Sequence, residues 1–243
     1  MTFRTNLFGA TAVAALVATV GGASAATIAI DSFETNQWVV DQPLPSQTNA
    51  SQVAAPGALG GFRDMAVNNE NGTVNGTELR ASSGILSFSN IALNQGSGTI
   101  TYDGDDDATT LNTQGLGGFD LAAAGTDPFF NFDVIQFDSN LQIGVSVYDM
   151  LGGVSTYDEV LPETEDGFSP RLAFSQFTGD ADFGNVGALQ FMVTSLGPNL
   201  DGAIRNITVS GGDIAPVPLP ASALLLLGGV GGLGLMRRKR KAA

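Results

Sequence analysis

Alternating apolar and polar positions run through most of the chain and predict β-strands. In Leu141-Gln142-Ile143-Gly144-Val145-Ser146-Val147, every second residue is apolar, and positions 189–194 alternate in the same way. A period of two places one set of side chains on each face of a strand. Four further segments have the same character: Ile85–Phe88, Thr99–Tyr102, Phe129–Phe137 and Ile204–Val209.

Clusters of Gly, Asn, Asp and Ser separate these segments at intervals that suit two packed sheets. No window outside the two ends of the chain shows helical periodicity. Residues 26–214 are enough for one domain with a substantial core. We therefore predict an all-β, jelly-roll-like β-sandwich over residues 26–214.

The N-terminal 25 residues have the pattern of a secretory signal peptide. Arg4 precedes an apolar stretch from about Leu7 to Val20, and Ala23-Ser24-Ala25 follows it. A charged start, an apolar run and an A-x-A site are typical of an exported chain. We predict cleavage after Ala25, so that the mature chain begins at Ala26. A retained membrane helix is the alternative, and the shortness of the run disfavours it.

The C-terminal residues 215–243 combine a proline-rich motif, an uncharged run and a basic end. Residues 221–236 carry no charge and include five glycines. As a helix they would span roughly 24 Å, which is short for a hydrocarbon core of about 30 Å. A basic cluster follows and predicts a stop-transfer signal that stays cytoplasmic: Arg237, Arg238, Lys239, Arg240 and Lys241. We predict one transmembrane helix over residues 221–236.

The residues before this helix, Val217-Pro218-Leu219-Pro220-Ala221, complete a recognisable arrangement. The tail resembles the PEP-CTERM class of bacterial sorting signals, in its VPLPA variant. That resemblance implies a membrane-embedded exosortase, a cysteine transpeptidase-like enzyme, as the partner that recognises the motif. It also implies an inner-membrane-anchored intermediate that later reaches the cell surface or the extracellular space. An ordinary tail anchor with a proline linker is the alternative.

The charge of the exported segment restricts its partners. All 24 Asp and Glu residues lie within residues 26–214, together with only four arginines and no lysine, so this segment carries a formal charge of −20. Nucleic acid and anionic lipid are therefore poor partners, whereas cations and neutral glycans are compatible. The chain contains no Cys and no His, which argues against disulfides, zinc and copper sites.

Two parts of the exported segment carry a second resemblance. Ile30-Asp31-Ser32-Phe33-Glu34 with Trp38 looks like the opening strand of carbohydrate-binding jelly rolls with a galactose-binding-like fold. Phe174-Ser175-Gln176-Phe177, the segment 183–193 and Ile204–Val209 are similar to their closing strands. The resemblance implies a structural calcium in which Glu34 would take part. Arg205-Asn206 stands where that family has acids.

An acidic loop offers a separate candidate site for calcium. Tyr102-Asp103-Gly104-Asp105-Asp106-Asp107 places four carboxylates within five residues, and a hard cation would relieve their repulsion. Ala108 and Gln114 occupy the positions where an EF-hand needs Gly and Glu, so the loop is not an EF-hand. Calcium binding by Asp103, Asp105, Asp106 and Asp107 and a solvated acidic turn both stay open.

The sequence offers little for catalysis and somewhat more for binding. Ser-His and Cys-His nucleophile pairs are impossible without His or Cys, and a Ser-Lys pair is impossible within residues 26–214, which contain no Lys. A pair of carboxylates that hydrolyses a glycoside is the remaining enzymatic alternative. For ligand stacking we select Trp38, Tyr102 and Tyr157, since aromatic rings pack against sugar rings, although aromatic residues also fill cores.

Together these features predict an exported, non-enzymatic protein of the cell surface or extracellular polysaccharide matrix. A structural or adhesive role is the leading expectation. A carbohydrate-binding module that acts as a glycan receptor is the first alternative, and a glycoside hydrolase is the second.

Overall fold

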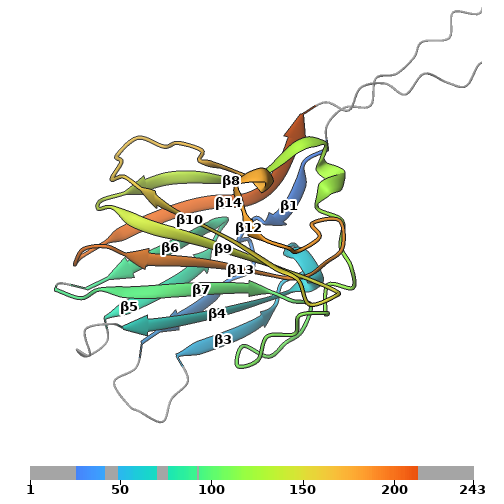
Figure 1. Ribbon diagram of the computed structural model, residues 1–243. Helices are drawn as coiled ribbons and strands as arrows, with labels where there is room; N and C mark the ends of the chain where they lie inside the picture. Colours follow the sequence, from blue (N-terminus) through green and yellow to red (C-terminus); the bar gives the residue numbers. More distant parts are fainter. Residues whose placement is uncertain (1–25, 42–48, 70–75, 92, 213–243) are drawn as a thin grey trace, which may run out of the picture. The chain divides into compact units, whose positions relative to one another are not determined.

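The computed structural model describes residues 26–41, 49–69, 76–91 and 93–212, which form a β-sandwich (Figure 1). The strands are β1 (Ile28–Asp31), β2 (Gln37–Val40), β3 (Ala50–Ala54), β4 (Phe62–Asn69), β5 (Thr77–Ser82), β6 (Ile85–Asn90), β7 (Gly96–Tyr102), β8 (Thr126–Phe137), β9 (Leu141–Asp149), β10 (Val154–Leu161), β11 (Arg171–Ala173), β12 (Thr178–Gly179), β13 (Val186–Ser195) and β14 (Asp201–Gly212). Three short 3₁₀ turns accompany them: Leu59–Gly61, Ala122–Ala124 and Phe174–Gln176.

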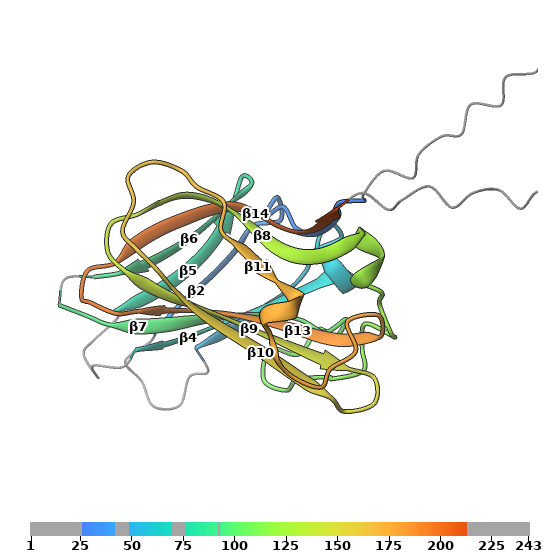
Figure 2. The ribbon, with the colours of Figure 1, turned by 45° about the horizontal axis from the view of Figure 1, so that its top comes forward.

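The strands form two seven-stranded antiparallel sheets. Sheet I has the order β11-β8-β14-β6-β5-β2, and β1 also pairs with β14. Sheet II has the order β12-β10-β9-β13-β7-β4-β3. The two sheets lie face to face, as the tilted view shows (Figure 2). This confirms the all-β fold and the two-sheet sandwich expected from the sequence. Each of the six strand segments predicted from alternation lies within an observed strand.

The β5–β6 hairpin shows how local sequence sets strand register. Ser83 and Gly84 connect the two strands with φ angles of 52° and 78°. Two consecutive positive φ values characterise the two-residue turn that matches the twist of paired strands. Glycine tolerates this conformation at little cost. The turn places Ser82 opposite Ile85 and so fixes the pairing of β5 with β6.

Aromatic residues from both sheets meet in the core. The Phe191 ring of sheet II packs edge-to-face against Phe130 and Phe132 of sheet I, with ring centroids 5.5 and 5.7 Å apart. Tyr102 of sheet II makes a similar contact with Phe191 at 5.9 Å. Such pairs each add about 0.5–1.5 kcal/mol beyond the area that they bury. Phe191 therefore lies at a contact that joins the sheets.

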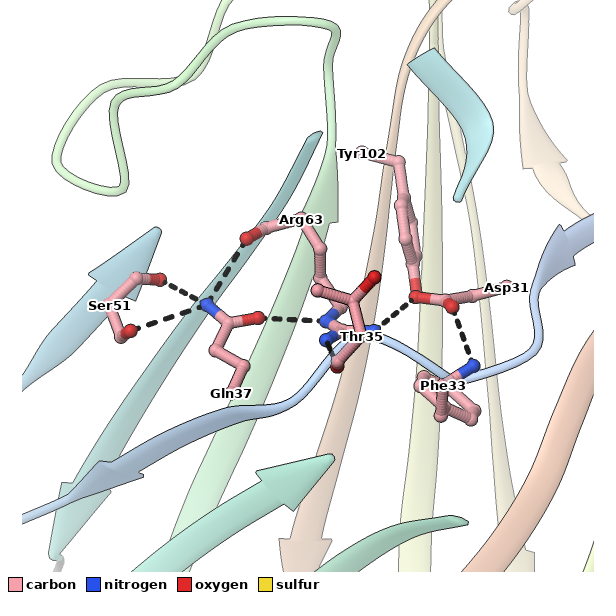
Figure 3. Close-up of polar contacts among 7 residues, drawn as sticks. All are labelled: Asp31, Phe33, Thr35, Gln37, Ser51, Arg63 and Tyr102. Carbon is pink, nitrogen blue, oxygen red and sulfur yellow. Dashed lines mark hydrogen bonds and ion pairs between the residues drawn. The ribbon is translucent and has the colours of Figure 1, made fainter. Parts of the chain in front are cut away.

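A buried polar network also connects the sheets (Figure 3). The Arg63 guanidinium of β4 contacts Asp31 Oδ2 of β1 at 2.9 Å and donates from Nε to Gln37 Oε1 of β2 at 2.7 Å. Tyr102 Oη donates to the same Asp31 oxygen at 2.8 Å, and Phe33 N donates to Asp31 Oδ1. Arg63 and Tyr102 are fully buried, so this ion pair is shielded from water. Burial, and then the charge of Asp31, raise the pKa of Tyr102 well above its usual value.

Several predicted features lie outside the described residues. These are the signal segment, which ends at Ala25 and includes Ala23, and three parts of the C-terminal tail. The three parts are the motif Val217–Ala221, the helix over residues 221–236 and the basic cluster Arg237–Lys241. Ala26 is the first residue that the structure describes. Within the described ranges, no helix is long and apolar enough to cross a membrane.

Candidate functional site

The outer face of sheet II carries a continuous line of polar side chains. Strand register places one residue from each of six neighbouring strands side by side, in the order Gln52, Asp64, Thr101, Gln190, Ser146 and Thr156. We call this set the central row. The alternate positions on the same strands, such as Ile100, Phe191 and Val145, point into the core. Six strands spaced about 4.8 Å apart give the row a length of roughly 24 Å.

Gln190 lies in the middle of the row and is held by neighbours on both sides. Tyr148 Oη of β9 donates to Gln190 Oε1 at 3.0 Å. Gln190 Nε2 donates to Thr101 Oγ1 of β7 at 3.1 Å. These bonds fix the orientation of the amide before any ligand arrives. A side chain that is already ordered loses less conformational entropy on binding.

Two hollows in this face share Gln190. The larger has a volume of about 340 Å³ and is lined by Thr99, Gly144, Val145, Ser146, Thr156, Asp158, Gln190 and Met192. Gly144 leaves room beside Asp158, because a Cβ atom at this position would lie 2.8 Å from Asp158 Oδ1. The smaller hollow, of about 190 Å³, is lined by Asp64, Thr101, Asp107, Ala108, Thr109, Thr110, Leu111 and Gln190. The shared glutamine joins them into one trough across the sheet.

Asp64 lies at the acidic end of the trough and is only 4% exposed. Its Oδ1 atom is buried and has no hydrogen-bond partner among the described residues. Burial raises the pKa of Asp64 from 3.8 to about 7, and the charges of Asp103, Asp106, Asp107 and Asp105 add to this effect. Near neutral pH, this carboxyl therefore exists in both protonation states.

The acidic loop is held together by its own carboxylates. Asp103 accepts hydrogen bonds from the backbone N–H groups of Asp105 and Asn112, at 3.1 and 2.8 Å. Asp107 accepts from the Thr109 and Thr110 hydroxyls, which lower its pKa. In the part of the chain that the structure describes, no three acidic side chains are grouped so that they could hold a metal ion. Calcium binding by Asp103, Asp105, Asp106 and Asp107 stays a prediction.

The three predicted stacking residues have different environments. Trp38 is 59% exposed, so its ring is accessible. Tyr102 is fully buried, and its selection as a stacking residue was wrong, because its side chain lies in the core beside Asp31 and Phe191. Tyr157 packs against the core, with its ring stacked on Phe177 at 5.4 Å. One face of the Tyr157 ring is therefore occupied.

The residues at the centre of the trough were not selected from the sequence. The alternation at positions 189–194 assigned Gln190 and Met192 to the face opposite the core, and this signal could have identified them. In the sequence, Gln190 is 89 residues from Thr101 and 44 residues from Ser146, and it is farther still from Asp64. Only the register of the assembled sheet shows that these side chains are adjacent.

Comparisons with known proteins give likeness of fold only. No family model and no curated protein sequence matches the chain. A family 11 carbohydrate-binding module from Clostridium thermocellum, solved with a β-1,3-1,4-mixed-linked tetrasaccharide, is 12% identical, with a TM-score of 0.36 over 73% of this chain and 97% of that one. A family 29 carbohydrate-binding module is 11% identical, with a TM-score of 0.36 over 73% and 90%.

An exo-β-agarase is 13% identical, with a TM-score of 0.42 over 77% of this chain. This chain spans about a quarter of the length of that agarase, since it covers 26% of it. Similarities at these levels do not assign the chain to any of these families.

Proposed function

We propose that this chain is an exported protein that binds polysaccharide through the trough on sheet II, with a structural or adhesive role at the cell surface or in the extracellular matrix. The observation that carries this proposal is the central row with its fixed glutamine at the junction of two hollows. We also propose that the sandwich is jelly-roll-like.

The chemistry of the trough suits a neutral glycan. Sugar hydroxyls both donate and accept hydrogen bonds, and the amide of Gln190 and the hydroxyls of Thr101, Ser146 and Thr156 can do the same. Met192 is 39% exposed beside them and offers apolar contact for the C–H faces of a sugar ring. None of the four arginines lies on this face, because Arg63 is buried and the other three belong to strands of sheet I. An anionic ligand would find no cation there.

Replacement of Gln190 with alanine is expected to weaken binding of a neutral glycan about tenfold. The change removes hydrogen bonds worth about 1–1.5 kcal/mol, and about 1.4 kcal/mol corresponds to a factor of ten in Kd. Affinity electrophoresis against a panel that includes mixed-linked β-glucan and agarose would measure the effect. Gln142→Ala is the matched control, because Gln142 lies on the same face of β9 but outside both hollows.

Two results would contradict this assignment. One is failure of the unaltered chain to bind any neutral glycan in the panel. The other is equal retardation of Gln190→Ala and the unaltered chain.

We take the domain to act by binding rather than by catalysis, since it has no His, Cys or Lys to serve as base or nucleophile. Release of reducing sugar during the assay would instead favour glycoside hydrolysis.

Export and sorting form the second part of the proposal. The signal segment would take the chain across the membrane, and the tail would hold it there until an exosortase-type enzyme recognises Val217–Ala221. Two prolines favour an extended motif with few backbone donors, which is an expectation from the sequence. The sequence resemblance supports this part, and the described residues do not include the motif.

Replacement of Pro218 and Pro220 with alanine is expected to leave an uncut precursor in the inner membrane. The reason is that the extended motif would be lost while the apolar run and basic cluster stay intact. Immunoblotting of fractionated cells would follow the precursor and the surface form. Pro216→Ala, one residue before the motif, is the matched control and should be processed normally. Normal processing of the double variant would reduce the motif to a linker.

A further inference from the structure

An exposed tryptophan lies on the other side of the sandwich from the trough. Trp38 belongs to β2, an edge strand of sheet I, and points outward, because its neighbours Gln37 and Val39 are buried. It is the only tryptophan in the chain and is 59% exposed. Tryptophan is highly buried on average, so a ring left in water needs a reason.

Arg80 of β5 lies directly beside Trp38. The two residues are Cα partners in the β2–β5 pair, a position in which Cβ atoms on the same face are about 4.5–5.5 Å apart. Arg80 is exposed. An aromatic ring and a guanidinium are therefore adjacent on one open face of the sheet.

Within the part of the chain that the structure describes, Arg80 differs from the other three arginines of residues 26–214 in that its side chain has no partner. Arg63 pairs with Asp31 at 2.9 Å, Arg205 lies 3.8 Å from Asp133, and the Arg171 guanidinium lies 3.7 Å from the Phe129 ring centre. Among the described residues, no ion pair, side-chain hydrogen bond or ring contact involves the Arg80 guanidinium. In a segment with 24 acidic residues, this cation is left available for another molecule.

A hollow of about 510 Å³ lies over the same two residues. Asn36, Gln37, Trp38, Arg80, Ala81 and Ser82 line it. The Gln37 amide is already engaged by Ser51 and Arg63. The polar side-chain groups left to a ligand are therefore the Arg80 guanidinium, the Asn36 amide and the Ser82 hydroxyl, in the hollow that Trp38 also lines.

We propose that the Trp38–Arg80 hollow binds an acidic saccharide, with a sugar ring stacked on Trp38 and its carboxylate paired with Arg80. Guanidinium forms two parallel hydrogen bonds with a carboxylate, and an indole provides a flat apolar surface for the sugar. A neutral sugar would account for the tryptophan alone and would leave the unpaired arginine unexplained.

The surrounding negative charge does not prevent this pairing. Glu78 is the acid nearest along β5, two residues from Arg80 on the same face. Glu34 reaches the β5–β6 turn, where a Cβ atom on Gly84 would lie 3.0 Å from its Oε1 atom. Charges separated by more than about 8 Å are largely screened at physiological salt. A contact that is only a few ångströms long is screened less. Recognition therefore depends on the local pair rather than on the net charge.

Two sites on opposite faces would allow one domain to join two polysaccharide chains. Trp38 and Arg80 lie on the outer face of sheet I, and the trough lies on the outer face of sheet II. This consequence rests on the proposed function, whereas the acidic-saccharide site itself does not. Such bridging would suit a structural protein of a matrix that contains neutral and acidic polymers.

The fluorescence of the single tryptophan reports directly on this site. An oligogalacturonate is titrated into the full-length chain, purified in detergent, and the emission of Trp38 is followed. The same oligomer with its carboxyl groups reduced to alcohols serves as the neutral probe. We expect a saturable change with the acidic oligomer and binding at least tenfold weaker with the reduced one.

Substitutions separate this site from the trough. Arg80→Gln is expected to weaken binding of the acidic oligomer at least tenfold, whereas Arg205→Gln, at an exposed arginine on β14, should leave it unchanged. Gln190→Ala should also leave it unchanged, and Arg80→Gln should leave neutral-glycan binding intact. Absence of an emission change, equal binding of both oligomers, or unaltered binding by Arg80→Gln would each overturn the proposal, whatever the result at the trough.

Discussion

Replacement of Arg63 with methionine is expected to lower the free energy of unfolding by about 3–5 kcal/mol, because it leaves the Asp31 carboxylate buried without its cation. Asp31 is 3% exposed and Arg63 is not exposed at all. Once the guanidinium is gone, only the Tyr102 hydroxyl and the Phe33 N–H group would stabilise that charge. Gln37 Oε1 would lose its donor as well. Urea unfolding of the purified chain, followed by circular dichroism, would measure the change.

A double variant separates the loss of a charge pair from the loss of packing. Arg63→Met together with Asp31→Asn removes both charges and should be more stable than Arg63→Met alone, since no isolated buried charge remains. Tyr102→Phe removes one hydrogen bond to a charged group and should cost less, about 1.5–3 kcal/mol. An Arg63→Met variant that unfolds at the same urea concentration as the unaltered chain would show that the network contributes no stability.

The alternation of residues predicted the strands well, because a half-buried strand needs one apolar face. The same alternation also accounts for the burial of Tyr102. Ile100 and Tyr102 are two residues apart in one strand and therefore share a face. Since Ile100 must face the core, Tyr102 must face it too, and its burial follows from strand geometry. Trp38 stands next to Val39 and takes the opposite face for the same reason.

The polar network and the trough could not be predicted in this way. Arg63 and Asp64 are adjacent in β4, so one of them had to point inward. Local sequence gives no reason to place the arginine in the core. The reason lies in Asp31, which is 32 residues away and reaches Arg63 only when the two sheets pack. In the same way, Asp64, Thr101 and Gln190 become neighbours only through long-range strand pairing.

The raised pKa of Asp64 predicts a pH dependence of stability with a definite sign. The carboxyl titrates near 3.8 in the unfolded chain and near 7 in the folded domain, so the folded state holds its proton more tightly. Below about pH 4 both states are protonated, and Asp64 adds no cost. Between about pH 4 and pH 7 the unfolded chain has released the proton and the folded domain has not, so stability falls as the pH rises. Above about pH 7 the full cost is present.

Asp64→Asn is therefore expected to stabilise the domain relative to the unaltered chain at about pH 8 and to lose most of that advantage at about pH 4. The change in pKa corresponds to at most about 4 kcal/mol, and an amide that lacks a partner in the same buried position would reduce the gain. Urea unfolding of both chains across this pH range would measure the difference, in which the contributions of the other acids cancel. Asp158→Asn, at an exposed aspartate on the same outer face, is the matched control and should keep the pH dependence of the unaltered chain. If Asp64→Asn and the unaltered chain lose stability in parallel from about pH 4 to pH 8, then burial does not raise the pKa of Asp64, and this residue is an ordinary carboxylate in the folded domain.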